Sequence, residues 1–273
     1  MKLIVENGGT KLDWVLLGSD PIYSCEGINV FSSKNDISNQ IKQIFPQDVL
    51  RLETLCIDFY TTGFNSIIDS KLTQIFHDNF QDCQINIFSD MLAASRALFK
   101  YDIGITCILG TGSNCAYFDG FKNNIITPSL GYLMGDYGSG YDLGRKLLIE
   151  YFNNNLDQKI HDSIEEKTQI SQEDLLASIY SFRNPKNYIA SFAKLVKYYE
   201  NEPLIQDIIT SSFLVFMEKN PYQYSQYQKY QFGFVGSIAF YFKTHISNIL
   251  SNQNIQAIFL EKPIDSLMNY YLP

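Results

Sequence analysis

The sequence has 273 residues, of which 45% are hydrophobic and 18% are charged, and its net charge at pH 7 is -8. This length predicts two lobes of roughly 100 to 150 residues each, because a single hydrophobic core seldom keeps growing in longer chains. The acidic balance argues against a nucleic-acid partner, since affinity for DNA or RNA depends on clustered Lys and Arg. No run approaches the ~18 apolar residues that a membrane span needs, so we expect no membrane partner.

The start of the chain and its cysteines indicate a reducing compartment. The opening MKLIVENGG lacks the basic segment, apolar run and cleavage site of a signal peptide, which predicts a cytoplasmic protein. The cysteines are five in number, widely spaced and without a CxxC pair: Cys25, Cys56, Cys83, Cys107 and Cys115. This usage predicts buried thiols rather than disulfides or a metal site.

The first third of the chain alternates between predicted strands and helices. Short apolar runs predict strands, in chain order, at residues 2–6, 13–17, 22–30, 54–60 and 84–88. Apolar residues at helical spacing, or a segment rich in Ala and Leu, predict helices at residues 36–44, 64–80 and 91–99. A Gly-containing turn joins the first two strands, which indicates a β-hairpin.

The same organisation begins again at Ile103. A strand to Leu109, a Gly-rich turn and a second strand through Phe118 repeat the opening hairpin. The later predicted elements are a mostly helical stretch over residues 141–219, a strand at 231–235, a helix to about residue 250 and a strand at 257–260. The repeat predicts an α/β fold of two related lobes with a central cleft and a helical insertion in the second lobe.

We place the N-terminal lobe at residues 1–89 and the C-terminal lobe, with its helical insertion, at residues 90–260. Residues 261–273 are a candidate for packing on the N-terminal lobe.

The turn of the first hairpin has the composition of a phosphate-binding loop. We assign Gly8, Gly9, Thr10 and Lys11 to phosphate binding, because glycines let the backbone approach a phosphate whose oxygens Thr and free N–H groups can hold. Glu6, where the strand enters the turn, could organise Mg²⁺ through water. An ordinary hairpin turn is the alternative for this segment.

A second turn of this kind consists of Gly110, Thr111, Gly112 and Ser113. Two such loops, one from each lobe, would hold the β- and γ-phosphates of a nucleotide from both sides. A tight turn without a ligand is the alternative, although this loop has more small and hydroxyl residues than a hairpin requires.

A third segment, at Gly236 and Ser237, lies where a strand meets a helix. A glycine there lets adenine or the α-phosphate lie against the helix N-terminus, whose dipole favours negative charge. The sequence has no GxxxxGK[ST], and no GxGxxG follows the first strand, so Walker-type and Rossmann sites lose their main support.

Two carboxylates are candidates for direct roles at a reacting centre. Asp90 follows a predicted strand and opens a helix, which suits a base that accepts a hydroxyl proton during attack on a γ-phosphate. Its alternative role is a helix cap. Asp136 lies in the Gly-rich segment 131–140 and could accept hydrogen bonds from two sugar hydroxyls. Tyr132, Leu133 and Met134 in this segment are too apolar for a solvated loop.

These segments, in this order, resemble the acetate and sugar kinase, Hsp-type chaperone and actin superfamily, and most of all the BadF/BadG/BcrA/BcrD ATPases and N-acetylglucosamine kinases. The resemblance covers essentially the whole chain, and GD-x-GSG soon after GTGS is its most specific element. It implies two ribonuclease H-like (actin-like ATPase) lobes that close on substrate and exclude water.

The resemblance also implies residue roles. Asp90 would be the catalytic base, and the loops around Thr10 and Thr111 would hold the phosphates of Mg-ATP. The implied sugar contacts are Asn29, Asp90, Gly131, Tyr132 and Asp136. The expected activity is ATP-dependent phosphorylation of a sugar hydroxyl, most readily that of N-acetylglucosamine or a related amino sugar, by a homodimer.

Three departures from the family pattern leave other functions open. First, the family has Asp at the position of Glu6 and Ser or a similar residue at the position of Gly9. Second, its turn at residues 61–63 is richer in Gly. Third, it has an acidic residue at the position of Tyr137. A catalytically weak nucleotide or sugar sensor is therefore one alternative. A BadF-type activator ATPase is another, but the scattered cysteines offer no convincing pair for its iron–sulphur cluster.

Overall fold

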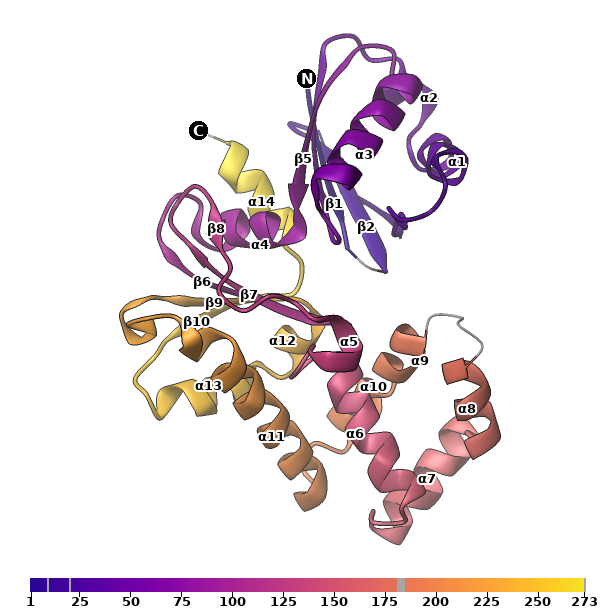
Figure 1. Cartoon of the computed structure of the whole chain (residues 1–273), viewed down its shortest axis with the longest axis vertical. Helices are drawn as coiled ribbons and strands as arrows, with labels where there is room; N and C mark the ends of the chain where they lie inside the picture. The colour runs from indigo at the N-terminus through magenta and orange to yellow at the C-terminus, as the bar shows by residue number, and fades with distance from the viewer. Residues whose placement is uncertain (9, 20, 181–184, 273) are drawn as a thin grey trace. The chain divides into compact units, whose positions relative to one another are not determined.

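The computed structural model describes residues 1–8, 10–19, 21–180 and 185–272, and it divides into two units (Figure 1). The first unit consists of Met1–Asp102, Gly120–Asn123 and Pro263–Pro273, and the second of Ile103–Asp119 and Asn124–Lys262. Each unit has its own five-stranded sheet and its own hydrophobic core. Over the described ranges, no helix is long and apolar enough to cross a membrane.

The sheet of the first unit has the strand order β3-β2-β1-β4-β5. Its strands are β1 (Lys2–Asn7), β2 (Lys11–Leu16), β3 (Tyr23–Glu26), β4 (Leu55–Thr61) and β5 (Cys83–Ser89). The first three form an antiparallel meander, whereas β4 and β5 run parallel to β1. Asn7, Thr61 and Ser89 are register partners, so the parallel strands end together at one edge of the sheet.

Helices cover both faces of this sheet. They are α1 (Lys34–Ile44), α2 (Gln47–Leu50), α3 (Ser66–Asn79), α4 (Asp90–Phe99) and α14 (Ile264–Tyr271). Phe59 of β4 packs edge-on against Phe76 of α3, within the core that α1 and α3 form with the sheet. The next residue, Tyr60, contacts the other face, where its hydroxyl bonds Tyr271 of α14 and accepts a hydrogen bond of 2.6 Å from Arg96 of α4. The alternation of side chains along β4 therefore separates the two helical layers.

The sheet of the second unit repeats this topology. Its strands are β6 (Gly104–Leu109), β7 (Ser113–Phe118), β8 (Asn123–Asn124), β9 (Phe232–Val235) and β10 (Ala257–Leu260). They lie in the order β10-β9-β6-β7-β8, with β7 antiparallel and β9 parallel to β6. When the strands of each unit are counted along the chain, both sheets have the order 3-2-1-4-5. The predicted duplication, and with it the α/β fold class of two lobes, is confirmed.

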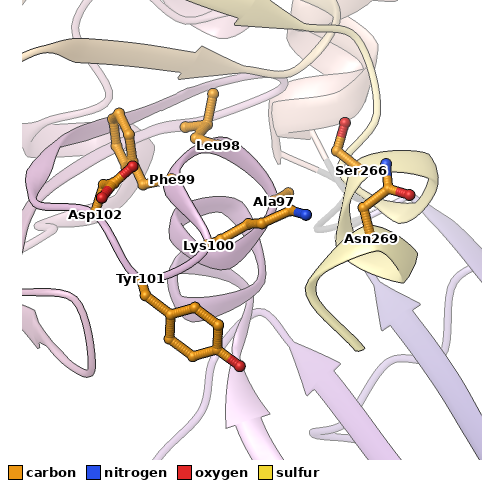
Figure 2. Close-up of a pocket in the computed structure, with 8 residues that line it drawn as sticks. All are labelled: Ala97, Leu98, Phe99, Lys100, Tyr101, Asp102, Ser266 and Asn269. Atoms are coloured by element: carbon orange, nitrogen blue, oxygen red, sulfur yellow. The ribbon is translucent and has the colours of Figure 1, made fainter. Parts of the chain in front are cut away.

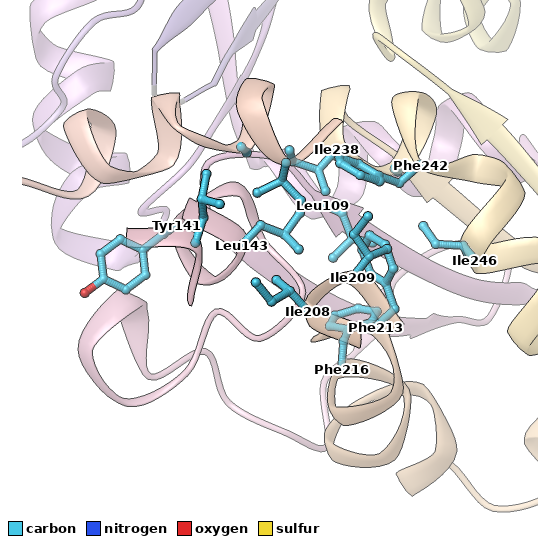
Figure 3. Packing of buried hydrophobic residues seen from close by; sticks show 14 of the residues in the cluster. Leu109, Tyr141, Leu143, Ile208, Ile209, Phe213, Phe216, Ile238, Phe242 and Ile246 are labelled. Atoms are coloured by element: carbon cyan, nitrogen blue, oxygen red, sulfur yellow. The ribbon is translucent and has the colours of Figure 1, made fainter. Parts of the chain in front are cut away.

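The predicted helical insertion lies between β8 and β9. Its helices are α5 (Gly131–Met134), α6 (Gly140–Phe152), α7 (Gln158–Thr168), α8 (Gln172–Tyr180), α9 (Pro185–Ser191), α10 (Ala193–Tyr198) and α11 (Pro203–Lys219), followed by 3₁₀ turns at Pro221–Gln223 and Tyr227–Lys229. Leu109 at the end of β6 packs in one cluster with Leu143 of α6 and with Ile209 and Phe213 of α11 (Figure 3). Because Leu109 belongs to this core, the core adjoins the turn that follows Leu109.

Most predicted element boundaries lie within two residues of those observed, and three larger differences have a structural reason. The third strand is shorter than residues 22–30, because the N–H of Ile28 donates to the side chain of Asn7 rather than to a neighbouring strand. The helix after Gly236 is divided at Phe242 into α12 (Ser237–Tyr241) and α13 (Lys243–Ser251). Helix α4 belongs to the first unit, although the predicted second lobe began at residue 90, because α4 packs against α14, β4 and β5.

Candidate functional site

A buried asparagine organises the first predicted phosphate loop. Asn7, at the end of β1, donates from Nδ2 to the carbonyl of Ile28 and to Oγ1 of Thr61, both at 3.0 Å, and its Oδ1 accepts from the N–H of Ile28 at 2.8 Å. These bonds fix the end of β1 to the end of β4 and to the segment before Asn29. This role of Asn7 was not predicted, although a polar residue at the end of an apolar strand is a signal that could have identified it.

The turn after Asn7 is held by its own backbone. The N–H of Gly8 donates to the carbonyl of Lys11 at 2.8 Å, and the N–H of Gly27 donates to the carbonyl of Thr10 at 3.3 Å. The structure therefore brings Gly8, Thr10 and Lys11 together beside Gly27, whereas Gly9 lies outside the described residues. Thr10 is exposed, so its hydroxyl is accessible to a ligand.

Three carboxylates lie near this turn. Glu6 and Asp13 are register partners on β1 and β2, so their side chains point to the same face of the sheet. Burial, followed by the negative charges of Asp90 and then Asp13, raises the pKa of Glu6 to about 8. Lys11 counters this charge in part, since its Nζ lies 3.3 Å from Oδ1 of Asp13. The predicted metal residue and the predicted base are thus electrostatic neighbours.

Asp13 was not singled out in the sequence, although it is 3% exposed and accepts a hydrogen bond from Ser24. A carboxylate between Leu12 and Trp14, in an otherwise apolar strand, was the signal that could have identified it.

Asp90 is the first residue of α4 and not its cap. Ser89 is the N-cap, because its Oγ accepts from the N–H of Leu92 at 3.2 Å. Oδ1 of Asp90 accepts from the N–H of Met91 at 2.8 Å, and its side chain is half-buried. The capping alternative for Asp90 is therefore wrong. Since Ser89 ends β5 in register with Thr61, Asp90 follows the same sheet edge that Asn7 closes.

Asn29, the predicted sugar contact of the first unit, lies in a turn after Ile28. Its Oδ1 accepts from the N–H of Phe31 at 3.1 Å, and its carbonyl accepts from the N–H of Ser32 at 3.0 Å. The residue is exposed, so its amide group remains accessible.

The second predicted loop is fixed by the helix that follows the Gly-rich segment. Within the loop, the N–H of Gly110 donates to the carbonyl of Gly112 at 2.9 Å. From the first turn of α6, the N–H groups of Gly140 and Tyr141 donate to the carbonyls of Gly110 (2.8 Å) and Thr111 (3.3 Å). These backbone hydrogen bonds therefore join the loop to the first turn of α6.

Gly236 packs directly against this loop. Its φ is +114°, and a Cβ atom there would lie 2.4 Å from the carbonyl oxygen of Leu109. Only glycine allows this backbone approach. The predicted adenosine segment, including the exposed Ser237, is thus brought beside the loop that contains Thr111.

Asp136 is tied to the same loop. It is 6% exposed, and its Oδ1 accepts from the N–H of Ser113 at 3.2 Å. Its Oδ2 lies 2.8 Å from Nζ of Lys186 in α9. Lys186 was not predicted, and no local pattern could have identified it, because its partner lies 50 positions earlier in the chain.

Gly131 and Tyr132 lie in the single turn of α5, which leads to Asp136. The N–H of Gly135 donates to the carbonyl of Gly131 at 2.8 Å. The ring of Tyr132 packs edge-on against that of Tyr141, with 5.0 Å between the ring centroids. Leu133 and Met134 are 77% and 68% exposed, so the expectation that this segment is too apolar for exposure was wrong for both. One helical turn can direct only part of its side chains inward.

A pocket of about 450 Å³ in the first unit contains none of the predicted site residues. It lies between the C-terminal end of α4 and α14, with Ala97 and Lys100 opposite Ser266 and Asn269 (Figure 2). The residues assigned to phosphate and sugar binding therefore lie outside this pocket.

Comparison with known proteins gives structural relatives only. No protein-family model and no curated protein sequence match the chain. A solved structure from Porphyromonas gingivalis, named "Putative N-acetylglucosamine Kinase", superposes with a TM-score of 0.92 at 26% identity, over 99% of this chain and 98% of that chain. The family resemblance is confirmed.

Two more distant structures share the fold. A protein from Chromobacterium violaceum, also named "Putative N-acetylglucosamine Kinase", has a TM-score of 0.73 at 12% identity and covers 98% of each chain. The ethanolamine utilization protein EutJ from Carboxydothermus hydrogenoformans has a TM-score of 0.51 at 12% identity, over 100% of this chain and 89% of that chain.

Proposed function

We propose that the protein transfers the terminal phosphoryl group of ATP to a sugar hydroxyl, with N-acetylglucosamine or a related amino sugar as the acceptor. The observation that supports this most strongly is the placement of the two Gly- and hydroxyl-containing turns. Each joins the first and second strands of its unit's sheet, so the duplicated topology gives them equivalent positions. The name of the Porphyromonas gingivalis structure, at 26% identity, supports the class of acceptor.

In this proposal, the first turn and the loop Gly110–Ser113 bind the nucleotide phosphates through backbone N–H groups and hydroxyls. The exposed Ser237 and the adjoining Gly236 bind the adenosine part, since both lie at the start of α12 beside that loop. Phosphoryl transfer requires little covalent chemistry from the protein, so positioning and charge stabilisation would supply most of the rate.

Asp90 is the proposed base that accepts the proton of the attacking hydroxyl. After burial, the charge of the half-buried Asp90 is the next cause that raises the pKa of Glu6, so the two carboxyl groups interact. The base and the cation-binding residue would therefore act on the same phosphate. Asn29, Gly131 and Tyr132 remain the proposed sugar contacts, whereas Asp136, whose buried carboxylate contacts the N–H of Ser113 and Nζ of Lys186, is proposed below to act on the second loop.

The residues near the first turn fit a magnesium ion. Glu6, Asp13 and Asp90 supply oxygen donors of the type that Mg²⁺ prefers, and the negative charges of Asp90 and Asp13 lie close enough to Glu6 to contribute, after burial, to its raised pKa. When bound, Mg²⁺ would neutralise the charge of the phosphates. Glu6 would hold it through water, as its place at the entry to the turn suggested.

A sensor without turnover is the second candidate, and the pKa of Glu6 favours it. At neutral pH a carboxyl with a pKa of about 8 is mostly protonated, which weakens its attraction for a cation.

The activator ATPase has less support. All five cysteines are free, as predicted, but Cys107 and Cys115 are the buried pair and the other three are partly exposed.

A coupled assay of ADP release tests the proposal. The protein is given Mg-ATP with N-acetylglucosamine, glucosamine, N-acetylmannosamine, glucose or an anhydro-muramyl sugar, or with no acceptor. We expect ADP only when an amino sugar is present. ATP binding without turnover on any sugar would favour the sensor, and ADP release without sugar would favour an ATPase. The homodimer and the cytoplasmic location remain predictions, which sedimentation and cell fractionation can check.

A further inference from the structure

A lysine of the helical insertion lies on the second phosphate loop. Nζ of Lys186 is 2.8 Å from Oδ2 of Asp136, and a Cβ atom at Gly112 would lie 2.5 Å from that Nζ. The ammonium group therefore occupies the space that a side chain at position 112 would fill. Its charge lies against the backbone of the loop to which we assign phosphate binding.

This ion pair differs from its neighbour in the same unit. Lys146 is 3.3 Å from Asp142 and also donates to Oγ of Ser212 at 2.7 Å. Among the described residues, Lys186 has no polar partner besides Asp136, and Oδ2 of Asp136 accepts no hydrogen bond of good geometry. The ammonium group of Lys186 thus has N–H donors that Asp136 does not engage.

The exposure of the pair is asymmetric. The side chain of Asp136 is 3% exposed, whereas that of Lys186 is 29% exposed. The carboxylate is thus fixed between the N–H of Ser113 and the ammonium group, while the lysine can be reached from solvent. Asp136 in this arrangement positions the ammonium group of Lys186 but leaves some of the lysine's hydrogen-bond donors available.

We propose that Lys186 is a phosphate-binding residue that contacts the β- and γ-phosphates of the nucleotide on the loop Gly110–Ser113, and that Asp136 positions it there in the nucleotide-free protein. This inference rests on the proposed function. A chain with a net charge of -8 needs a local cation to bind a polyphosphate, and a lysine ammonium group serves phosphate as a compact point charge.

The test is isothermal titration calorimetry of the full chain with Mg-ATP and, separately, with adenosine. The variants are Lys186→Met, Lys186→Arg and the matched control Lys197→Met, which removes a lysine that is paired with Glu200 at 2.6 Å in the same helical layer. Thermal unfolding of each variant confirms that it is folded.

We expect Lys186→Met to weaken Mg-ATP binding by roughly tenfold or more, because a hydrogen bond to a charged group contributes about that much. Adenosine binding should be unchanged, Lys186→Arg should retain part of the ATP affinity, and Lys197→Met should behave as wild type. If the ion pair had only a structural role, its loss would instead lower the affinities for Mg-ATP and for adenosine alike.

Three results would overturn the inference, and the failure of the inference alone is distinguishable from the failure of the proposed function. If wild type binds Mg-ATP and Lys186→Met binds it equally well, or loses ATP and adenosine affinity in the same proportion, the inference fails and the proposed function stands. If folded wild type binds no Mg-ATP, both fail together.

Discussion

The two hairpin turns have equivalent places in their sheets but opposite electrostatic surroundings. Near the first turn, burial and then the negative charges of Asp90 and Asp13 raise the pKa of Glu6. At the second turn, the ammonium group of Lys186 covers the loop and a buried Asp136 holds it. The strand order is the same in both sheets, whereas the charged side chains beside the two turns differ.

The largest expected effect comes from removing the base beside the first turn. Asp90→Asn should lower kcat by about a thousandfold, because general-base catalysis contributes factors of that order. The fold should be intact, since Ser89 caps α4 without Asp90. Steady-state kinetics and thermal unfolding measure the two effects, with Asp69→Asn in the first turn of α3 as the control. Wild-type turnover by Asp90→Asn would exclude this residue as the base.

The backbone contact that fixes the second turn should have the next largest effect. Gly236→Ala places a Cβ atom 2.4 Å from the carbonyl oxygen of Leu109 at a φ of +114°, which should destabilise the fold by about 3 kcal/mol. Gly110→Ala is the matched control, because no atom lies within 4 Å of its added Cβ. Urea unfolding followed by circular dichroism compares them, and equal stabilities would contradict the contact.

The first turn is supported by the side chain of Asn7, whereas the second turn is supported by a backbone contact with Gly236. Asn7→Ala removes the three hydrogen bonds to Ile28 and Thr61 and should destabilise the fold by about 2 kcal/mol, since buried backbone groups lose their partner. The exposed Asn29→Ala should change stability by less than about 0.5 kcal/mol. Urea unfolding decides this, and a smaller loss for Asn7→Ala than for Asn29→Ala would show that Asn7 does not organise the turn.

The smallest expected effect is the pH dependence caused by Glu6. Its pKa is raised from 4.5 to about 8 in the folded protein, so between these values the folded state holds a proton that the unfolded state has lost. Stability should therefore fall as pH rises through this window.

Glu6→Gln should remove this part of the pH dependence and be more stable than wild type near pH 8. Thermal unfolding of both proteins from pH 5 to 9, without nucleotide or metal ion, measures it. Parallel curves for the two proteins would show that Glu6 has an ordinary pKa.

The sequence was sufficient for elements whose signal is local. The hairpin that contains Gly8 and the Gly-rich turn at Gly110 were predictable, because turn residues lie between apolar runs that must form strands. The helix that Asp90 opens was predictable from its Ala- and Leu-rich composition. The repeat of these units predicted the duplicated topology.

What the sequence missed depends on contacts between distant residues. Lys186 acquires its place from packing of the helical insertion, 50 residues after Asp136 and 74 after Gly112. The early end of the third strand likewise depends on the bond from Ile28 to Asn7, 21 residues away. Hydrophobic periodicity contains no information about either pairing.

Phosphorus NMR of a reaction mixture of the protein, Mg-ATP and N-acetylglucosamine tests the central claim most directly, because it identifies where the γ-phosphoryl group goes. The account predicts that the γ-phosphate resonance of ATP is replaced by that of a sugar phosphate monoester, and that Asp90→Asn stops this conversion. Inorganic phosphate as the only new signal, or an unchanged ATP spectrum with every amino sugar tried, would contradict it.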